Sequence, residues 1–380
     1  MLIDTMADYS TEDVPALLAE AARSGSGVHD TTVGDVVVAS YADVRRLLPD
    51  RCLTTKRPPS DTSGLSPVRR AMRARYVKWP LFSDGDYHAR LRAHLQGAIG
   101  KLDDDALSRI GAHVTRAHQR HASDTFSWLE TISEPVSVDV IAAVLGSSGE
   151  ETEWLVEKAK VILEELAWQV TDEEGFAGVV SAMESVAQWL DAALTHGRLT
   201  TPFMTALSAI SQDPELGFDA ALGALCQTIT GAYDPLVAAV SVLGLLSGSP
   251  SFAHGESAGL CEEVLRLSSP FRFTRRFATR PIELKGRVIP AHTRVLLGLG
   301  PANLDETAFP EPREPGTERR AHVAFGGGSH YCLGAEAVRD SLRALTGVMT
   351  EHGFAFEASN VVHHPSLAIL RFTTVDGRWR

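Results

Sequence analysis

The residues best suited to do chemistry lie in one stretch, residues 325–334, which reads F-G-G-G-S-H-Y-C-L-G. Cys332 follows three glycines and precedes the helix-forming run 335–345, so we expect it at the positive N-terminal end of a helix. The helix dipole and the free N–H groups of the loop favour a thiolate there. The pattern predicts a soft metal ligand or a nucleophile. A buried cysteine beside a glycine turn is the plain structural alternative.

The same stretch matches the pattern F-x-x-G-x-[HR]-x-C-x-G, and in this the chain resembles the cytochrome P450 superfamily of haem-thiolate monooxygenases. The resemblance implies that Cys332 is the axial ligand of the iron of haem b and that Phe325 lies against the haem near the sulfur. The loop with Gly326 and Gly334, which carry no Cβ, would lie against this flat group, and its amides would tune the sulfur.

Further stretches match positions at which the family binds the two haem propionates. His88 and Arg92 are four residues apart in the helical run 84–99, so they share a face and could hold carboxylates; they match H-x-x-x-R. Residues 274–278 resemble T-x-R-x-A, which points to Arg276, and His322 matches a further propionate-binding histidine. A solvated surface pair is the alternative for His88 and Arg92.

Glu263 and Arg266 match the family's E-x-x-R, which implies a structural role. Their spacing places both side chains on one helix face, where a buried bidentate pair would lock the core around the cysteine loop. Residues 301–305 resemble A-A-N-R-D with Leu304 in place of the arginine. Whether Arg313 or Arg319 completes the network is left open.

The longest apolar periodic run, residues 218–246, resembles the family's central helix on the oxygen-binding face of the haem. The family pattern [AG]-G-x-[DE]-T-[TS] is replaced by G-A-Y-D-P-L, so the catalytic candidates are Gly231, Asp234 and Pro235. Pro235 stands where a threonine hydroxyl would help to deliver protons. A proline here removes the hydrogen bond to the Gly231 carbonyl and should kink the helix.

Three replacements for that hydroxyl are open: a group of the substrate, Asp234 acting through water, or a reaction that needs no such delivery. A helix that merely tolerates a proline is the structural alternative. The candidate substrate contacts on this helix are Gln227, Thr230 and Tyr233, although Gln227 could equally bond the backbone.

The elements that must position these residues form one domain over residues 1–380, mostly α with small β regions (α+β), which the resemblance identifies as the cytochrome P450 fold. With 380 residues, 44% of them hydrophobic, the chain can bury a large core. Helices are predicted over 13–24, 41–48, 84–99, 107–121, 136–145, 152–167, 176–195, 202–211, 218–246 and 257–268, strands over 33–39 and within 272–300, and a loop over 54–66. Most of Trp154, Trp168 and Trp189 are expected in the core or between helices.

Composition narrows the class of protein. The net charge of −12 argues against nucleic acid as a partner. The four cysteines show no Cys-x-x-Cys pair, so neither a disulfide framework nor a zinc site is indicated. Without an apolar run of 18 residues or a leader pattern, we expect a cytoplasmic protein with no membrane contact.

The resemblance implies a bacterial-type monooxygenase that uses O2 and electrons from NAD(P)H through a ferredoxin and its reductase. Pro235 favours secondary-metabolite tailoring by a substrate-assisted or non-hydroxylating oxidation, such as cyclisation, coupling or desaturation, on a small molecule, free or carrier-protein-bound. Alternatives are an O2-independent haem-thiolate enzyme (peroxygenase, isomerase or dehydratase) and a catalytically silent binding module. The arginines expected to meet an acidic ferredoxin are Arg69, Arg70, Arg73, Arg90, Arg92, Arg339 and Arg343.

Overall fold

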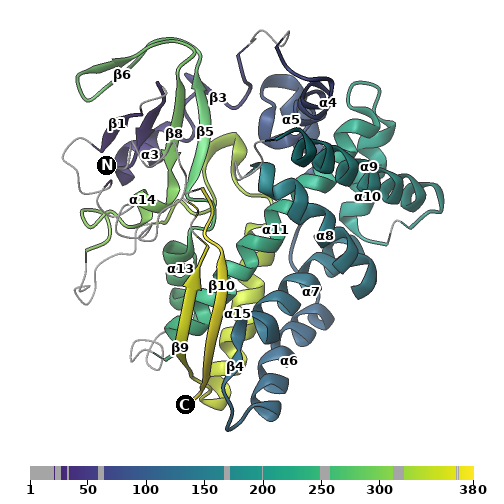
Figure 1. The fold of residues 1–380 in the computed structure, drawn as a ribbon, viewed down its shortest axis with the longest axis vertical. Helices are drawn as coiled ribbons and strands as arrows, with labels where there is room; N and C mark the ends of the chain where they lie inside the picture. Colours follow the sequence, from purple (N-terminus) through teal and green to yellow (C-terminus); the bar gives the residue numbers. More distant parts are fainter. Residues whose placement is uncertain are drawn as a thin grey trace.

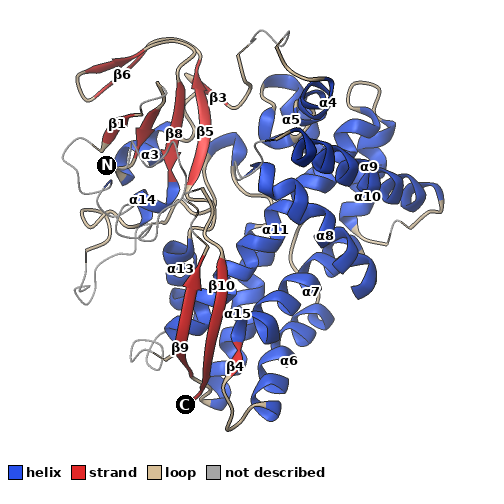
Figure 2. Ribbon diagram, in the orientation of Figure 1, coloured by secondary structure: helices blue, strands red, loops and turns tan. Residues whose placement is uncertain are grey.

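The chain folds into a region of small sheets and a larger region of helices, which lie beside each other in Figure 1 and Figure 2. The computed structural model describes residue 21 and residues 27–31, 34–58, 64–166, 172–198, 200–248, 257–310, 321–364, 366 and 368–380. The predicted helix at 13–24 lies almost wholly outside these residues, as do Trp168, Arg313 and Arg319.

A five-stranded sheet forms the first region, with the strand order β1-β2-β8-β5-β3. Its strands are β1 (Val28–Asp30), β2 (Val36–Val38), β8 (Arg294–Gly298), β5 (Phe273–Ala278) and β3 (Leu53–Thr54). Only the β2–β8 pair is parallel, and the valines of β2 are fully buried, as expected for strands covered on both faces. β6 (Ile282–Leu284) and β7 (Arg287–Ile289) form a hairpin whose turn is Lys285-Gly286.

Helices make up most of the rest of the described chain. They are α3 (Tyr41–Leu47), α4 (Pro67–Tyr76), α5 (Gly85–Leu95), α6 (Asp104–Arg120), α7 (Glu134–Leu145), α8 (Gly149–Leu166), α9 (Glu173–Thr195), α10 (Pro202–Gln212), α11 (Gly217–Ser247), α13 (Ser257–Ser268), α14 (Leu299–Asn303) and α15 (Ala335–His352), with the short turns η1 (Pro80–Phe82), η2 (Leu129–Ser133) and η3 (Gly328–His330). The helices predicted within the described residues are confirmed to within a few residues at their ends, and the α+β class is confirmed.

The centre of the fold is α11, which runs through the middle of the molecule in Figure 1. It packs against α7, α8, α10 and α13. Its length and composition would suit a membrane span, yet 72% of its most apolar window is buried inside the fold. The helix continues without a break through Pro235, so the proline does not end it.

A three-stranded sheet near the C-terminus was not predicted. It has the order β4-β10-β9, from β4 (Phe126–Ser127), β10 (Phe372–Trp379) and β9 (Phe356–His363). In β9 only Phe356 is buried, so the strand lacks the alternation that identifies a strand from sequence. Phe356 packs among Trp128 and Trp379 and fixes this sheet to the helices.

Candidate functional site

The loop before α15 is held by its own backbone. The N–H of Cys332 donates to the carbonyl oxygen of Phe325 at 3.0 Å. Gly326 and Gly328 have φ of 69° and 66°, a conformation that favours glycine. A Cβ on Gly328 would also lie 2.7 Å from the Cα of Pro49. The loop geometry therefore requires these glycines, and it presents Cys332 just before the first turn of α15.

The Cys332 thiol does not behave as the helix position alone suggests. Burial raises its pKa, and the Gly334 N–H with the charges of Arg92 and Arg339 offsets only part of this increase. In the absence of a bound cation, burial therefore favours the neutral thiol, which is the opposite direction to that expected from the helix end alone. A bound metal cation would supply the missing stabilisation, since coordination deprotonates a thiol.

His88 on α5 is a buried histidine with an unused nitrogen. Its side chain is only 4% exposed, and Nε2 has no hydrogen-bond partner among the described residues. Its ring stacks on His330, with centroids 4.2 Å apart, and His330 Nε2 lies 2.8 Å from Asp84 Oδ1. Burial, with the positive potential of His330, lowers the pKa of His88 to about 4. Nε2 is thus an available donor or acceptor for a ligand.

Arg276 on β5 is a buried guanidinium without an acidic partner. It is 4% exposed, and Nη1 donates to Thr274 Oγ1 at 2.7 Å and to the Arg275 carbonyl at 2.9 Å. No carboxylate of the described residues pairs with it. Burial lowers its pKa to about 10, although Asp84 acts in the opposite sense. A buried cation of this kind is stable only if an anion compensates it.

The other two predicted propionate ligands have protein partners. Arg92 Nη1 donates to the Tyr331 carbonyl at 2.8 Å, which ties α5 to the cysteine loop. His322 Nε2 lies 3.1 Å from Glu262 Oε2, but not in hydrogen-bonding geometry. Arg339 holds the same carboxylate at 2.7 Å. Sequence reasoning missed Glu262, Arg339, Asp84 and His330 as neighbours of these groups.

Together these residues fit a flat, dianionic group such as haem. Among the described residues, His88 Nε2 has no hydrogen-bond partner and Arg276 has no ion-paired carboxylate, and Cys332 offers a sulfur from a loop whose Gly326 and Gly328 require glycine. Open space also lies beside Gly231 on α11, where an added Cβ would meet nothing within 4 Å. The donors, the sulfur and this open space are what a haem with two propionates would need.

Glu263 and Arg266 form the bidentate contact that their spacing predicted. Arg266 Nη2 and Nε lie 2.6 and 3.0 Å from the two carboxylate oxygens of Glu263. Arg266 Nη1 also donates to the Asn303 carbonyl at 2.6 Å, and Asn303 Oδ1 accepts from the Val323 N–H at 2.9 Å. Asn303, which sequence reasoning noted only as part of a motif, therefore links this pair to the chain leading into the cysteine loop at Phe325.

In the middle of α11, over residues 220–244, one side stays partly or fully exposed while the other residues are buried. This stripe consists of Gln227, Thr228, Gly231, Ala232 and Pro235. The spacing of 227, 231 and 235 is that of one helix face. Gln227 Oε1 accepts from the Leu81 N–H at 2.7 Å, and Thr228 Oγ1 donates to the Ala224 carbonyl. The stripe brings Gly231 and Pro235 together, as the catalytic hypothesis requires.

The remaining candidates on α11 point elsewhere. Asp234 is buried and pairs with Arg371, with Nη2 2.6 Å from Oδ2. Thr230 is buried, and its hydroxyl donates to the Cys226 carbonyl. Tyr233 is buried beneath Lys160, whose Nζ lies 4.9 Å from the ring centroid. This packing gives no support to Thr230 and Tyr233 as substrate contacts, because neither belongs to the partly exposed stripe.

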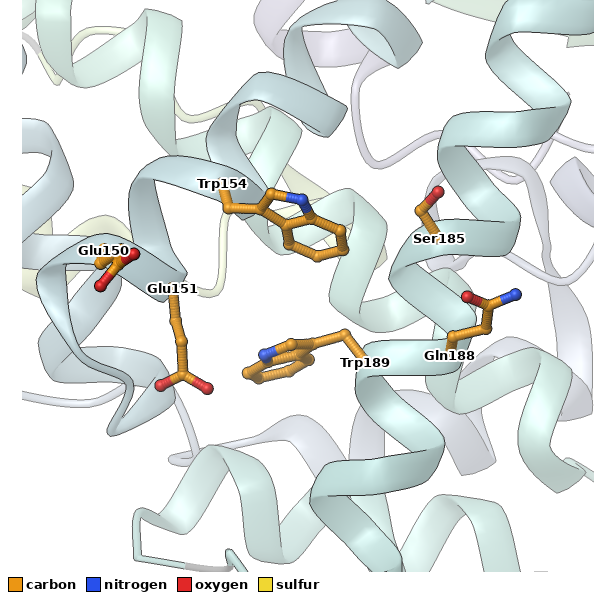
Figure 3. A pocket seen from close by; sticks show the side chains of 6 residues that line it. All are labelled: Glu150, Glu151, Trp154, Ser185, Gln188 and Trp189. Carbon is orange, nitrogen blue, oxygen red and sulfur yellow. The ribbon is translucent and has the colours of Figure 1, made fainter.

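A hollow between α8 and α9, of about 500 Å³, lies apart from these residues (Figure 3). Trp154 and Trp189 line it with Glu150, Glu151, Ser185 and Gln188. Trp154 is 40% exposed, so it departs from the expectation of a core or interhelical residue. Lys158 and Arg198 already lie over the two indoles, at 5.5 and 5.4 Å. None of the predicted site residues lines this hollow.

Comparison with protein families gives one family model that matches, described as Cytochrome P450, over residues 259–339. That range contains Glu263, Arg266 and Cys332. The chain is similar to the 6-deoxyerythronolide B hydroxylase of Saccharopolyspora erythraea, with 36% identity over 114 residues. The matched part covers 28% of this chain and only 28% of that relative.

Solved structures are similar over nearly the whole chain. P450BioI, in complex with an acyl carrier protein ligated to hexadec-9Z-enoic acid, has a TM-score of 0.77 and 19% identity, covering 96% of this chain and 100% of that one. P450 OxyD, described as involved in the biosynthesis of vancomycin-type antibiotics, has a TM-score of 0.75 and 19% identity, covering 98% and 97%. At this identity the likeness concerns the fold.

Proposed function

This chain belongs to the cytochrome P450 superfamily, and from this we propose that it is a haem-thiolate monooxygenase or oxidase acting on a small organic substrate. The observation that carries the proposal is the pair of buried groups left without a hydrogen-bonded or ion-paired acid among the described residues, His88 Nε2 and the Arg276 guanidinium, together with the thiol of Cys332. A cationic guanidinium, an imidazole nitrogen that a propionate would favour in its charged form, and a sulfur are groups that haem b can use.

In this proposal Cys332 binds the iron, and His88 and Arg276 bind the propionates. Arg92 and His322, with their side chains beside the loop, would complete the propionate contacts. Phe325, Gly326 and Gly334 shape the loop against the haem face. When bound, haem supplies the dioxygen chemistry that no side chain here provides. Glu263 and Arg266 hold the loop in place through Asn303.

The distal side of the site is set by α11. Gly231 leaves room for a ligand, and Pro235 brings neither a hydroxyl nor an N–H to the stripe. Asp234 is paired with Arg371 on another side of the helix, so a proton passing from it to the stripe would need a bridging water. These features support a substrate-assisted or non-hydroxylating oxidation, in which a group of the substrate positions the proton that a threonine would hold.

We propose O2 as oxidant and NAD(P)H as electron source, through a ferredoxin and its reductase, in a cytoplasmic enzyme. The arginines expected to meet the ferredoxin are partly neutralised within the chain. Arg90 pairs with Asp213, Arg339 with Glu262, and Arg343 with Asp340. Docking would therefore depend on Arg69 and Arg70 more than on these three.

The names of similar proteins support a role in secondary-metabolite biosynthesis. OxyD is described as acting in the biosynthesis of vancomycin-type antibiotics, and P450BioI was solved with a loaded acyl carrier protein. A substrate presented by a carrier protein is therefore one form of the proposal, and a free small molecule is the other.

The experiment is a spectroscopic comparison of cysteine variants. We would load haem, reduce the protein and add carbon monoxide, using wild type, Cys332→Ser and the control Cys52→Ser. Wild type and the control are expected to give the red-shifted Soret band of a thiolate-ligated haem, and Cys332→Ser is expected to lose it. A wild-type protein that binds no haem would overturn the proposal and favour a silent binding module.

Pro235 also favours a second candidate, a peroxygenase driven by hydrogen peroxide, because such a reaction needs no proton delivery from α11. The test compares two supplies of oxidant: hydrogen peroxide alone, and O2 with NADPH, ferredoxin and reductase. Turnover with peroxide and none with the ferredoxin system would select this candidate.

A further inference from the structure

Arg275 and Arg276 are neighbours in β5 but face opposite sides of the sheet, since side chains alternate along a strand. β5 pairs antiparallel with β8, so that Arg275 lies opposite Leu296 and Phe277 lies opposite Arg294. Arg275 and Arg294 are therefore diagonal neighbours on one face. Arg276, which is proposed to bind a propionate, lies on the other face.

Arg57 joins them from the neighbouring strand edge. It follows β3, which pairs with β5 through Thr54 and Phe277. Its positive charge lowers the pKa of Arg275, and Arg294 does the same. We call Arg57, Arg275 and Arg294 the arginine cluster. Arg294 pairs with Asp35, so one of the three charges of the arginine cluster is compensated by a direct contact.

Arg275 has no such contact. Its guanidinium lies over the ring of Phe82, 5.3 Å from the centroid, and among the described residues no hydrogen-bonded or ion-paired acceptor meets it. Burial is the main reason that its pKa falls to about 10. The charge of Glu165, at the end of α8, acts on Arg275, and burial raises the pKa of the Glu165 carboxyl despite the arginines around it. Among the described residues Glu165 makes no ion pair with Arg275.

The position of Arg275 connects it to α11. Phe82 ends η1, and the Leu81 N–H in the same turn donates to Gln227, the first residue of the partly exposed stripe. Gln227 and Pro235 are eight residues apart, which is about 12 Å along a helix. A molecule that lies along the stripe would meet Ala232 and Pro235 at one end and the arginine cluster near the other.

We propose that Arg275, supported by Arg57, binds the carboxylate of a free substrate whose apolar part lies along the α11 stripe. The inference rests on the proposed function and names its substrate class: an amphiphilic carboxylic acid. One unpaired guanidinium offers a two-pronged donor that matches one carboxylate. A carrier-bound thioester has lost that carboxylate, so the inference favours the free substrate over the tethered one.

The test compares two probes that differ only in charge, 4-phenylbutyrate and 4-phenylbutyramide. Binding to the haem-loaded protein is measured by calorimetry at low salt, for wild type, Arg275→Gln and the control Arg280→Gln, an exposed arginine just beyond β5. Wild type and control are expected to bind the carboxylate at least about tenfold more tightly than the amide. Arg275→Gln is expected to lose this preference while keeping its thermal midpoint.

Equal affinity for both probes, no binding of either, or an unchanged preference in Arg275→Gln would each overturn the inference. So would tighter binding of phenylbutyryl on a carrier protein than of the free acid. The carbon monoxide spectrum of the same samples separates the two failures. A normal thiolate spectrum without carboxylate preference refutes only the substrate class, whereas a missing spectrum refutes the proposed function.

Discussion

Arg371 and Asp234 form a two-pronged contact, in which Nε and Nη2 of the arginine lie 2.8 and 2.6 Å from the same oxygen, Oδ2. Asp234 lies on α11 beside Pro235, and Arg371 directly precedes β10. The third nitrogen of the guanidinium, Nη1, reaches Glu164 Oε1 on α8 at 2.6 Å. The acid nearest to Pro235 is therefore fixed from two other elements, one of them 137 residues away.

Replacing Arg371 by Gln should destabilise the fold strongly. The change leaves Asp234, whose side chain is 7% exposed, as a buried charge without its partner, which costs about 3–5 kcal/mol. Urea unfolding measures the loss. The control Arg378→Gln removes an exposed pair with Glu357 and should cost under about 1 kcal/mol. Equal losses of unfolding free energy in the two variants would contradict the prediction that the buried Arg371–Asp234 pair contributes more to stability than the exposed pair.

Two glycines of α11 should respond to alanine with opposite signs. A Cβ at Gly231 meets nothing within 4 Å, so Gly231→Ala should stabilise the helix by up to about 1 kcal/mol. A Cβ at Gly244 would lie 2.5 Å from Trp128 Cε2, and forcing that contact should cost about 1–3 kcal/mol. Thermal unfolding of the two variants checks both signs. A loss in Gly231→Ala would mean that the side of α11 at this position is closed.

The sequence predicted what depends on local spacing. Glu263 and Arg266 are three residues apart, so one helix brings them together wherever it packs. The stripe through Gln227, Gly231 and Pro235 also follows the helical period, but our candidates on this helix included Thr230, Tyr233 and Asp234, which are buried on its other sides. Spacing alone could not show that Tyr233 and Thr230 lie on a buried side of α11, because their burial depends on how α7 and α8 pack against this helix.

Contacts between residues far apart in the chain could not be predicted from the sequence. Arg371 carries no motif that pairs it with Asp234, and Asn303 reaches Arg266 only because α14 packs against α13. The β9 strand is exposed except at Phe356, so it lacks the alternation of apolar and polar residues from which a strand can be predicted. The raised pKa of Cys332 also needed the structure, because burial is a property of the fold.

His88 should make the stability of the haem-free protein depend on pH. Its pKa is about 4 in the fold against 6.5 for the ordinary group, so the unfolded chain binds the proton first as the pH falls. Stability contributed by His88 is complete above pH 6.5 and is lost as the pH falls to about 4, by up to about 3 kcal/mol. The measurement is the difference in unfolding free energy between wild type and His88→Asn at several pH values.

Haem supplies the control for this pH dependence. A propionate beside Nε2 favours the charged imidazole, so the haem-loaded protein should show a smaller slope between the same two variants. A difference that is flat with pH in the haem-free protein would contradict the depressed pKa. A slope unchanged by haem would count against His88 as a propionate ligand.

Pro235→Thr tests whether the proline is a functional substitution or a loss. Threonine restores the N–H for the Gly231 carbonyl, so the free energy of unfolding should rise by about 1–3 kcal/mol. Pro235→Ala restores the same N–H without a hydroxyl and serves as the control. If the substrate positions the proton itself, the ratio of product formed to NADPH consumed should be no higher in Pro235→Thr than in Pro235→Ala. A clear gain with threonine alone would show that the chain lacks a proton donor it needs, and the substrate-assisted reaction would then be wrong.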